Sequence, residues 1–207
     1  MEPEARPTSG PATDAAGHVA WRAFLVALAC GFAFGAADQY LGSRGVTLGL
    51  WATTASVASA PWILVPFLAG CSQTDPRRAA LLGLLVTAAA LAGYFTLMWS
   101  PLEGVRPDQV LATLPQLLSS QWHDIAGGLV TGPLFGRVGQ RWRVYRSWTS
   151  AALVAGAFCL EPIARRTVGQ LPPPAVVWIV EIVTGVALAM LFLAATLLRS
   201  ARTAPPS

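Results

Sequence analysis

The chain has 207 residues, of which 54% are hydrophobic and 12% are charged, a composition that excludes an ordinary soluble domain. Its net charge is +4, and all 14 basic residues are arginines. These arginines fall in the gaps between apolar runs, as the topology signals of membrane proteins do, and do not line a soluble face that would bind nucleic acid. We therefore expect a multi-pass protein of the bacterial cytoplasmic membrane, with the lipid bilayer as a partner and no nucleic acid.

Both ends of the chain are predicted to be disordered cytosolic tails. Residues 1–18 are polar and proline-rich, and they resemble neither a signal peptide nor a packed element. Residues 200–207 have a similar character. The predicted membrane domain therefore covers residues 19–199.

Six apolar runs between charged breaks approach the length of about 20 residues that a helix needs to cross a bilayer core of about 30 Å. They cover residues 20–38, 47–70, 79–99, 122–137, 147–164 and 174–198. The sequence therefore predicts an all-α fold, a polytopic transmembrane bundle of about six spans. The fourth run is short and contains several glycines and Pro133, so taken alone it also fits a broken or re-entrant segment.

The distribution of arginines favours six full spans. With six spans and both termini in the cytosol, ten arginines lie inside and four lie outside, in agreement with the positive-inside rule. The tryptophans agree, because seven of the eight fall at predicted membrane boundaries and Trp62 alone falls in the middle of a span. Residues 107–120, which carry leucines at helical spacing, are predicted to form an amphipathic helix on the outer surface.

Small residues spaced four apart mark helix faces where two backbones approach closely in lipid. Two interpretations are open for each such row, packing inside the bundle or docking of another membrane subunit. The rows are Ala23 with Ala27, Gly31 with Gly35, Gly128 with Gly132 and Gly136, and Gly185 with Ala189.

Acids inside the predicted spans are the most informative polar residues, because an Asp at the centre of a membrane helix costs about 2.5–3.5 kcal/mol. Asp38, Asp124, Glu161 and Glu181 all lie toward the predicted outer side. Glu181 is the deepest, about 10 Å into the sixth span at 1.5 Å per residue. We expect it to point into the bundle or into a wet cavity.

The predicted topology places Tyr94, His123 and Trp178 near the level of these acids. Carboxylates beside aromatic rings suit a small polar or cationic solute, so the four acids and these three side chains are predicted to form an outward-facing ligand site. The alternative is that the acids only bridge helices or reach water. Their candidate partners in that case are Arg44, Arg165 and Arg166.

No pattern typical of an enzyme or a metal site occurs in the sequence. It contains no P-loop, no HExxH, no GxGxxG after a strand and no set of residues that would form a Ser-His-Asp triad. Cys30, Cys71 and Cys159 lack disulfide or metal-ligand spacing, and the adjacent His123 and Asp124 point in different directions on a helix. We therefore expect no enzymatic activity, no metal and no cofactor.

Several short motifs carry a resemblance to a known family. They are APW (60–62), FLAG (67–70), RRAALLG (77–83), GYF (93–95), GGLVTGPLFGRVG (127–139) and AGAFCLE (155–161). Over roughly residues 25–165 the chain resembles a family of small actinobacterial integral membrane proteins of unknown function, with the GPLFG block and Glu161 as the most specific features. The resemblance implies a multi-span fold and no assigned activity.

More distantly, the chain is similar to the substrate-binding subunits of energy-coupling-factor vitamin transporters. This resemblance implies a six-helix protein with an outward-opening pocket, whose first helix docks onto a coupling subunit through an AxxxA row that Ala23 and Ala27 match. The function expected from the sequence is therefore a small-solute binding or uptake component. The alternative is a structural or regulatory membrane protein with no small ligand.

Overall fold

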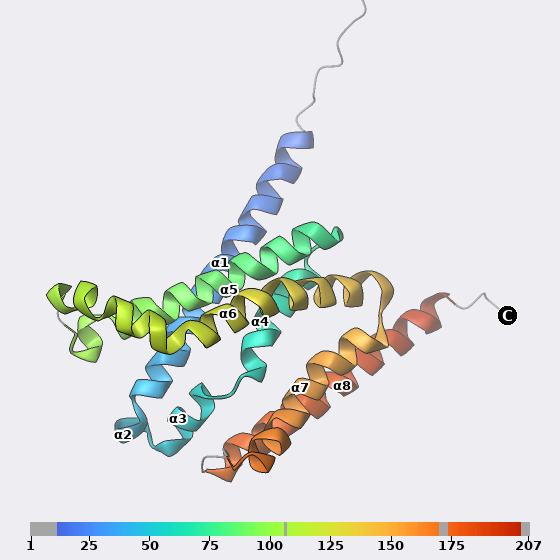
Figure 1. The fold of residues 1–207 in the computed structure, drawn as a ribbon. Coiled ribbons are helices and arrows are strands. Elements are labelled where there is room, and N and C mark those ends of the chain that lie inside the picture. Colours follow the sequence, from blue (N-terminus) through green and yellow to red (C-terminus); the bar gives the residue numbers. More distant parts are fainter. Residues whose placement is uncertain (1–11, 106, 170–173, 204–207) are drawn as a thin grey trace, which may run out of the picture.

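The computed structural model describes residues 12–105, 107–169 and 174–203, and within these ranges the chain is helical apart from short connections. The prediction of an all-α fold is confirmed. The helices, drawn in Figure 1, are α1 (Ala12–Ser43), α2 (Gly45–Leu48), α3 (Leu50–Ser56), α4 (Ala60–Cys71), α5 (Pro76–Met98), the 3-10 turn η1 (Pro101–Glu103), α6 (Pro107–Tyr145), α7 (Trp148–Thr167) and α8 (Ala175–Thr203).

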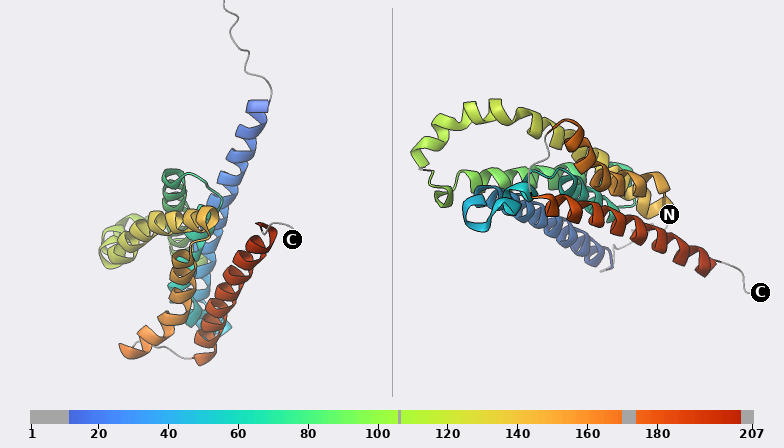
Figure 2. Two further views of the ribbon diagram at one scale, coloured as in Figure 1. Left: turned by 90° about the vertical axis from the view of Figure 1, so that its right-hand side faces the viewer. Right: turned by 90° about the horizontal axis from the view of Figure 1, so that it is seen from below.

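Helices α1, α4, α5 and α6 pack into one group, and α7 and α8 form a hairpin beside it (Figure 1). The hairpin is attached through an aromatic core in which the ring of Phe192 lies 5.8 Å from Phe67 of α4 and 4.6 Å from Trp142 of α6. The N-terminal part of α1 extends beyond the other helices in both Figure 1 and Figure 2. Within α1, Ala23 is exposed and Ala27 is half-buried.

Helices α1 and α5 run parallel and touch through glycines. Gly31 faces Val86, and Gly35 faces Ala90 so closely that an added Cβ would lie 1.8 Å from the Ala90 carbonyl oxygen. Because only glycine permits this separation, the row of Gly31 and Gly35 serves packing inside the bundle. Its other interpretation, docking of a subunit, is wrong for these two residues.

Helix α6 runs antiparallel along α5 through a second glycine row. Gly136 meets the backbone of Ala79, and Gly132 meets the backbone of Gly83 four residues further along α5. Gly128 contacts Thr87, one more turn along. The row predicted in the fourth apolar run is therefore also an internal packing surface.

Three helices in the described part of the chain are long and apolar enough to cross a membrane: Trp21–Ser43, Pro76–Met98 and Ala175–Arg199. The pair Leu50–Ser56 and Ala60–Cys71 passes the same test together, as a broken span bent by 50° or a re-entrant loop. Three or four candidate spans indicate a multi-pass membrane protein. Helices α6 and α7, which hold the fourth and fifth predicted spans, are not among these candidates.

The prediction of one unbroken helix over residues 47–70 is wrong. The helix is interrupted at Gly49, between α2 and α3, and again between Ser56 and Ala60, where α3 and α4 meet at the 50° bend. Pro61 lies in the first turn of α4 and has no N–H to donate to the carbonyl of Val57. An unbroken helix through residues 56–61 would lack that hydrogen bond, which favours the break between α3 and α4.

Residues 107–120 are helical, as predicted, but they are not a separate surface helix. They continue into the fourth apolar run as the single 39-residue helix α6. Figure 2 shows the bend of this long helix, which contains Pro115 and Pro133, residues that bend helices without ending them.

The helices also extend into both predicted tails. Helix α1 begins at Ala12, within the predicted tail of residues 1–18, and α8 continues to Thr203, beyond the predicted end at residue 199. The remainder of the two tails, residues 1–11 and 204–207, lies outside the described residues.

Candidate ligand site

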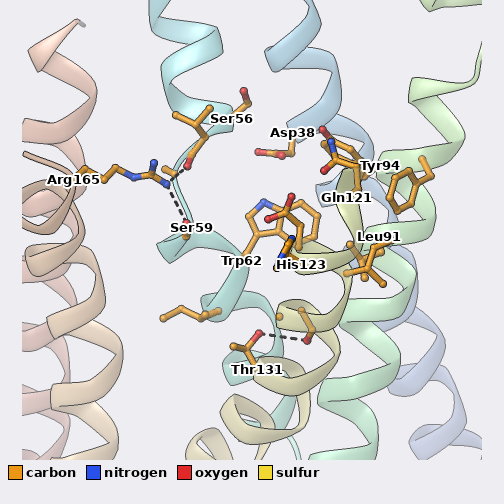
Figure 3. A pocket seen from close by; sticks show the side chains of 18 residues that line it. Asp38, Ser56, Ser59, Trp62, Leu91, Tyr94, Gln121, His123, Thr131 and Arg165 are labelled. Atoms are coloured by element: carbon orange, nitrogen blue, oxygen red, sulfur yellow. Dashed lines mark hydrogen bonds between the residues drawn. The ribbon is translucent and has the colours of Figure 1, made fainter. Parts of the chain in front are cut away.

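A cavity of about 490 Å³ lies where the C-terminal parts of α1 and α5 meet the start of α4 and the middle of α6 (Figure 3). Four of the seven predicted ligand residues line it. These are Asp38 from α1, Tyr94 from α5, and His123 and Asp124 from α6.

The cavity combines acids with aromatic rings. The half-buried carboxylate of Asp38 lies near the Trp62 side chain of α4. Asp38 and Asp124 both act electrostatically on the Tyr94 hydroxyl, which places two acids near one phenol. The Trp62 ring stands edge-on to Tyr94 at 6.2 Å and to Phe34 at 5.3 Å. Trp62 and Tyr94 line the cavity, and Phe34, outside the lining, packs against Trp62. Figure 3 shows Asp38 above the Trp62 ring with Tyr94 beside them.

One edge of the cavity is the break between α3 and α4, where residues 56–59 line the wall. A helix start leaves backbone N–H groups without partners inside the helix. Here the Glu161 carboxylate, on α7, accepts hydrogen bonds from the backbone N–H groups of Ser59 at 2.8 and 2.9 Å and of Ala60 at 2.7 Å. Glu161 thus caps α4 from another helix and stabilises the break.

Arg165 also stabilises the α3–α4 break. It pairs with Glu161 at 2.8 Å and donates to the Val57 carbonyl and to the Ser59 hydroxyl, the latter at 3.1 Å. Its guanidinium also lies 5.7 Å from the centre of the Trp178 ring. Figure 3 shows Arg165 reaching from α7 to the α3–α4 break, where it lines the cavity. For Glu161, the alternative of pairing with an arginine is confirmed.

Glu181 and Trp178 belong to α8 and do not line the cavity. Their side chains face α7, where they meet Arg165 and Glu161, and the exposed fractions are 6% for Glu181 and 3% for Trp178. The expectation that Glu181 points into the bundle is confirmed. Both carboxyl oxygens of Glu181 are buried without a hydrogen-bond partner in the described part of the chain, and Glu161 and Arg165 act on it electrostatically.

The structure therefore divides the predicted site into two parts. The cavity holds Asp38, Tyr94, His123 and Asp124, while a second cluster holds the half-buried Glu161 and the buried Trp178 and Glu181. Arg165 belongs to both and connects them.

Sequence reasoning missed Trp62 and the backbone at Ser59 as parts of the site. The signal for Trp62 was present, because it is the tryptophan that falls away from the predicted membrane boundaries. The signal for Ser59 was weaker, since Pro61 inside a predicted span is compatible with a kink as well as a break. Among the described residues, no group of three or more His, Cys, Asp or Glu side chains is arranged to hold a metal ion.

The model of one protein family, described as "Family of unknown function (DUF6518)", matches residues 14–205. The chain therefore belongs to this family, which agrees with the resemblance to a family of unknown function and extends it over most of the chain. No curated protein and no solved structure matches the chain.

Proposed function

We propose that this member of DUF6518 binds a small polar or cationic solute in the cavity between α1, α4, α5 and α6, as the binding component of an uptake system. The observation that carries the proposal is the gathering of Asp38 and Asp124 around the Trp62 and Tyr94 rings in one cavity. A volume of about 490 Å³ falls in the range of small-molecule pockets, about 300–1,000 Å³.

The charges around the cavity favour a cation. Arg165 is the arginine in the cavity wall, and its charge is matched by Glu161 at 2.8 Å. The carboxylates of Asp38 and Asp124 have no such partner in the wall. Because aromatic faces and carboxylates both attract cations, an amine would find complementary groups on two sides.

The proposal includes six spans with the cavity facing outward. Its support is helix packing, since residues 128–136 of α6 lie against residues 79–87 of the candidate span α5 and must share its depth. In the same way α7 lies antiparallel against the candidate span α8. With an even number of spans, the arginine distribution favours both termini in the cytosol and the cavity on the outer side.

A topology experiment tests this arrangement. Leu102 and Tyr145 are 65% and 71% exposed and lie at opposite predicted faces, whereas Gln140 is 6% exposed and unsuitable for labelling. With the native cysteines replaced, a membrane-impermeant maleimide added to intact cells is expected to label Leu102→Cys and not Tyr145→Cys. Permeabilised cells provide the control, in which both label. Labelling of Tyr145→Cys in intact cells would refute the six-span topology.

Solute binding is tested by thermal melting of the detergent-purified protein with a panel of amines, amino acids and vitamins. A bound solute at 100 times its Kd stabilises the fold by about 2.7 kcal/mol and raises Tm. We expect the double variant Asp38→Asn/Asp124→Asn to lose this shift. Glu103→Gln removes an acid outside the cavity, bonded to Ser43, and should keep it.

The alternative function is a structural or regulatory membrane protein in which acids only bridge helices. Glu161 favours it, because its hydrogen bonds with backbone N–H groups and its ion pair with Arg165 stabilise the α3–α4 break. A wild-type protein that responds to no compound in the panel supports this alternative. In the uptake proposal, a coupling subunit would dock on the face of α1 that carries the exposed Ala23 and the half-buried Ala27.

A further inference from the structure

A second hollow, a groove of about 700 Å³, lies at the other end of the bundle between the start of α5 and the C-terminal part of α6. Along α6 it begins at Arg137, about 20 Å from Asp124 of the cavity at 1.5 Å per residue. The groove is therefore separate from the proposed solute site. Its lining consists of Thr74, Pro76, Arg137, Gln140, Arg141, Val144, Tyr145 and Ser147.

Two arginines in this groove lack a counter-charge. Arg137 and Arg141 are four residues apart on α6, so they share a helix face and repel each other. Neither arginine forms a hydrogen bond or an ion pair with a residue in the described ranges. An anion between the two guanidinium groups would remove the repulsion and complete their hydrogen bonds.

The neighbouring charged groups are already engaged elsewhere. Arg143 donates to the carbonyls of Cys71 and Ser72 at 2.9 and 2.7 Å, and Arg146 lies over the Trp142 ring. The acid of this region, Asp75, accepts a hydrogen bond from the backbone N–H of Arg78 and caps α5. Asp75 is thus held at the start of α5, and it is not among the residues that line the groove.

The groove is also shaped before a ligand arrives. The Gln140 side chain is 6% exposed and donates to the Thr74 carbonyl at 2.8 Å, which fixes α6 against the chain that leads into α5. Tyr145 and Trp148 are 71% and 53% exposed beside it. Exposed Tyr and Trp rings at a helix end are typical of the headgroup level of a membrane.

We infer that this groove binds the phosphate of an anionic phospholipid headgroup through Arg137 and Arg141. The guanidinium fork matches phosphate oxygens in a bidentate arrangement, and the exposed aromatic rings place the groove where such headgroups lie. The anionic lipids of the cytosolic leaflet supply this chemistry on the side that the arginine distribution assigns to the groove. The inference does not depend on the solute cavity.

The test is native mass spectrometry of the detergent-purified full chain titrated with phosphatidylglycerol or with phosphatidylcholine of the same acyl chains. We expect the wild type to bind phosphatidylglycerol more tightly. Arg137→Gln/Arg141→Gln should weaken that binding about 30-fold, which corresponds to ~1 kcal/mol for each arginine near an anionic membrane surface. Both side chains are exposed, so the variant is expected to fold.

The matched control is Arg77→Gln/Arg78→Gln, which removes two exposed arginines at the same end of the bundle but outside the groove lining. It should retain most of the affinity for phosphatidylglycerol. Arg137→Lys/Arg141→Lys keeps the charge without the bidentate fork and should lie between the wild type and the Gln variant.

Two results would overturn the inference. Equal losses in the groove variant and the control would show that the attraction is spread over the whole basic end. Displacement of bound phosphatidylglycerol by inorganic phosphate would assign the groove to soluble phosphate compounds instead. We expect phosphate alone not to displace the lipid, because the acyl chains add contacts with the apolar helix surface.

Discussion

Replacing Glu161 by glutamine is expected to lower the free energy of unfolding by about 1–3 kcal/mol, the usual cost of leaving partly buried donors without their acceptor. The Glu161 carboxylate accepts from the N–H groups of Ser59 and Ala60 and from Arg165. An amide carries one acceptor oxygen and no charge, so the start of α4 loses part of its cap. Arg165, whose side chain is 23% exposed, loses its counter-ion. Thermal melting in detergent measures the effect as a large fall in Tm.

Glu181→Gln is the matched control for this substitution. Glu181 also lies in the α7–α8 hairpin and is more deeply buried than Glu161, but neither of its oxygens has a hydrogen-bond partner in the described chain. Glu181→Gln leaves the α4 cap and the Glu161–Arg165 pair in place, and it should therefore leave the Tm near the wild-type value or raise it. If Glu181→Gln proved as destabilising as Glu161→Gln, the assignment of Glu161 as the residue that holds the α3–α4 break would be wrong.

The helix faces were predictable from the sequence because they depend on local spacing. Gly31 with Gly35, and Gly132 with Gly136, are rows of small residues, and a row of this kind in a membrane helix has few uses besides close packing. The burial of Glu181 followed from the high free energy of a carboxyl group in lipid. Each argument needed one helix at a time.

The division of the predicted site could not be found in this way. Depth in the membrane orders Asp38 and Glu181 along the bilayer normal, but it does not determine which helices are neighbours. In the structure Asp38 faces the cavity near α4, while Glu181 faces α7 on the other side of Arg165. That separation arises from tertiary packing, which sequence periodicity does not encode.

The α3–α4 break was missed for a related reason. Hydropathy measures the length of an apolar run and not its direction, so residues 47–70 looked like one span. The break is stable because Glu161, 102 residues beyond Ser59 in the chain, supplies acceptors for the exposed N–H groups. In α6 the opposite occurred, since polar residues at 119–124 suggested a boundary where the helix continues.

The second large effect is expected from a single methyl group at the α1–α5 contact. In Gly35→Ala the new Cβ would lie 1.8 Å from the carbonyl oxygen of Ala90, which belongs to backbone and cannot turn aside. The helices must separate, and overpacking of this kind typically costs about 1–3 kcal/mol.

Gly156→Ala provides the matched control, because nothing lies within 4 Å of its added Cβ. There alanine should stabilise α7 by about 1 kcal/mol through its higher helix propensity. Thermal melting of the two variants is therefore expected to move Tm in opposite directions, down for Gly35→Ala and up for Gly156→Ala. A Gly35→Ala protein that melts at or above the wild-type temperature would mean that α1 and α5 are not in backbone contact at this position.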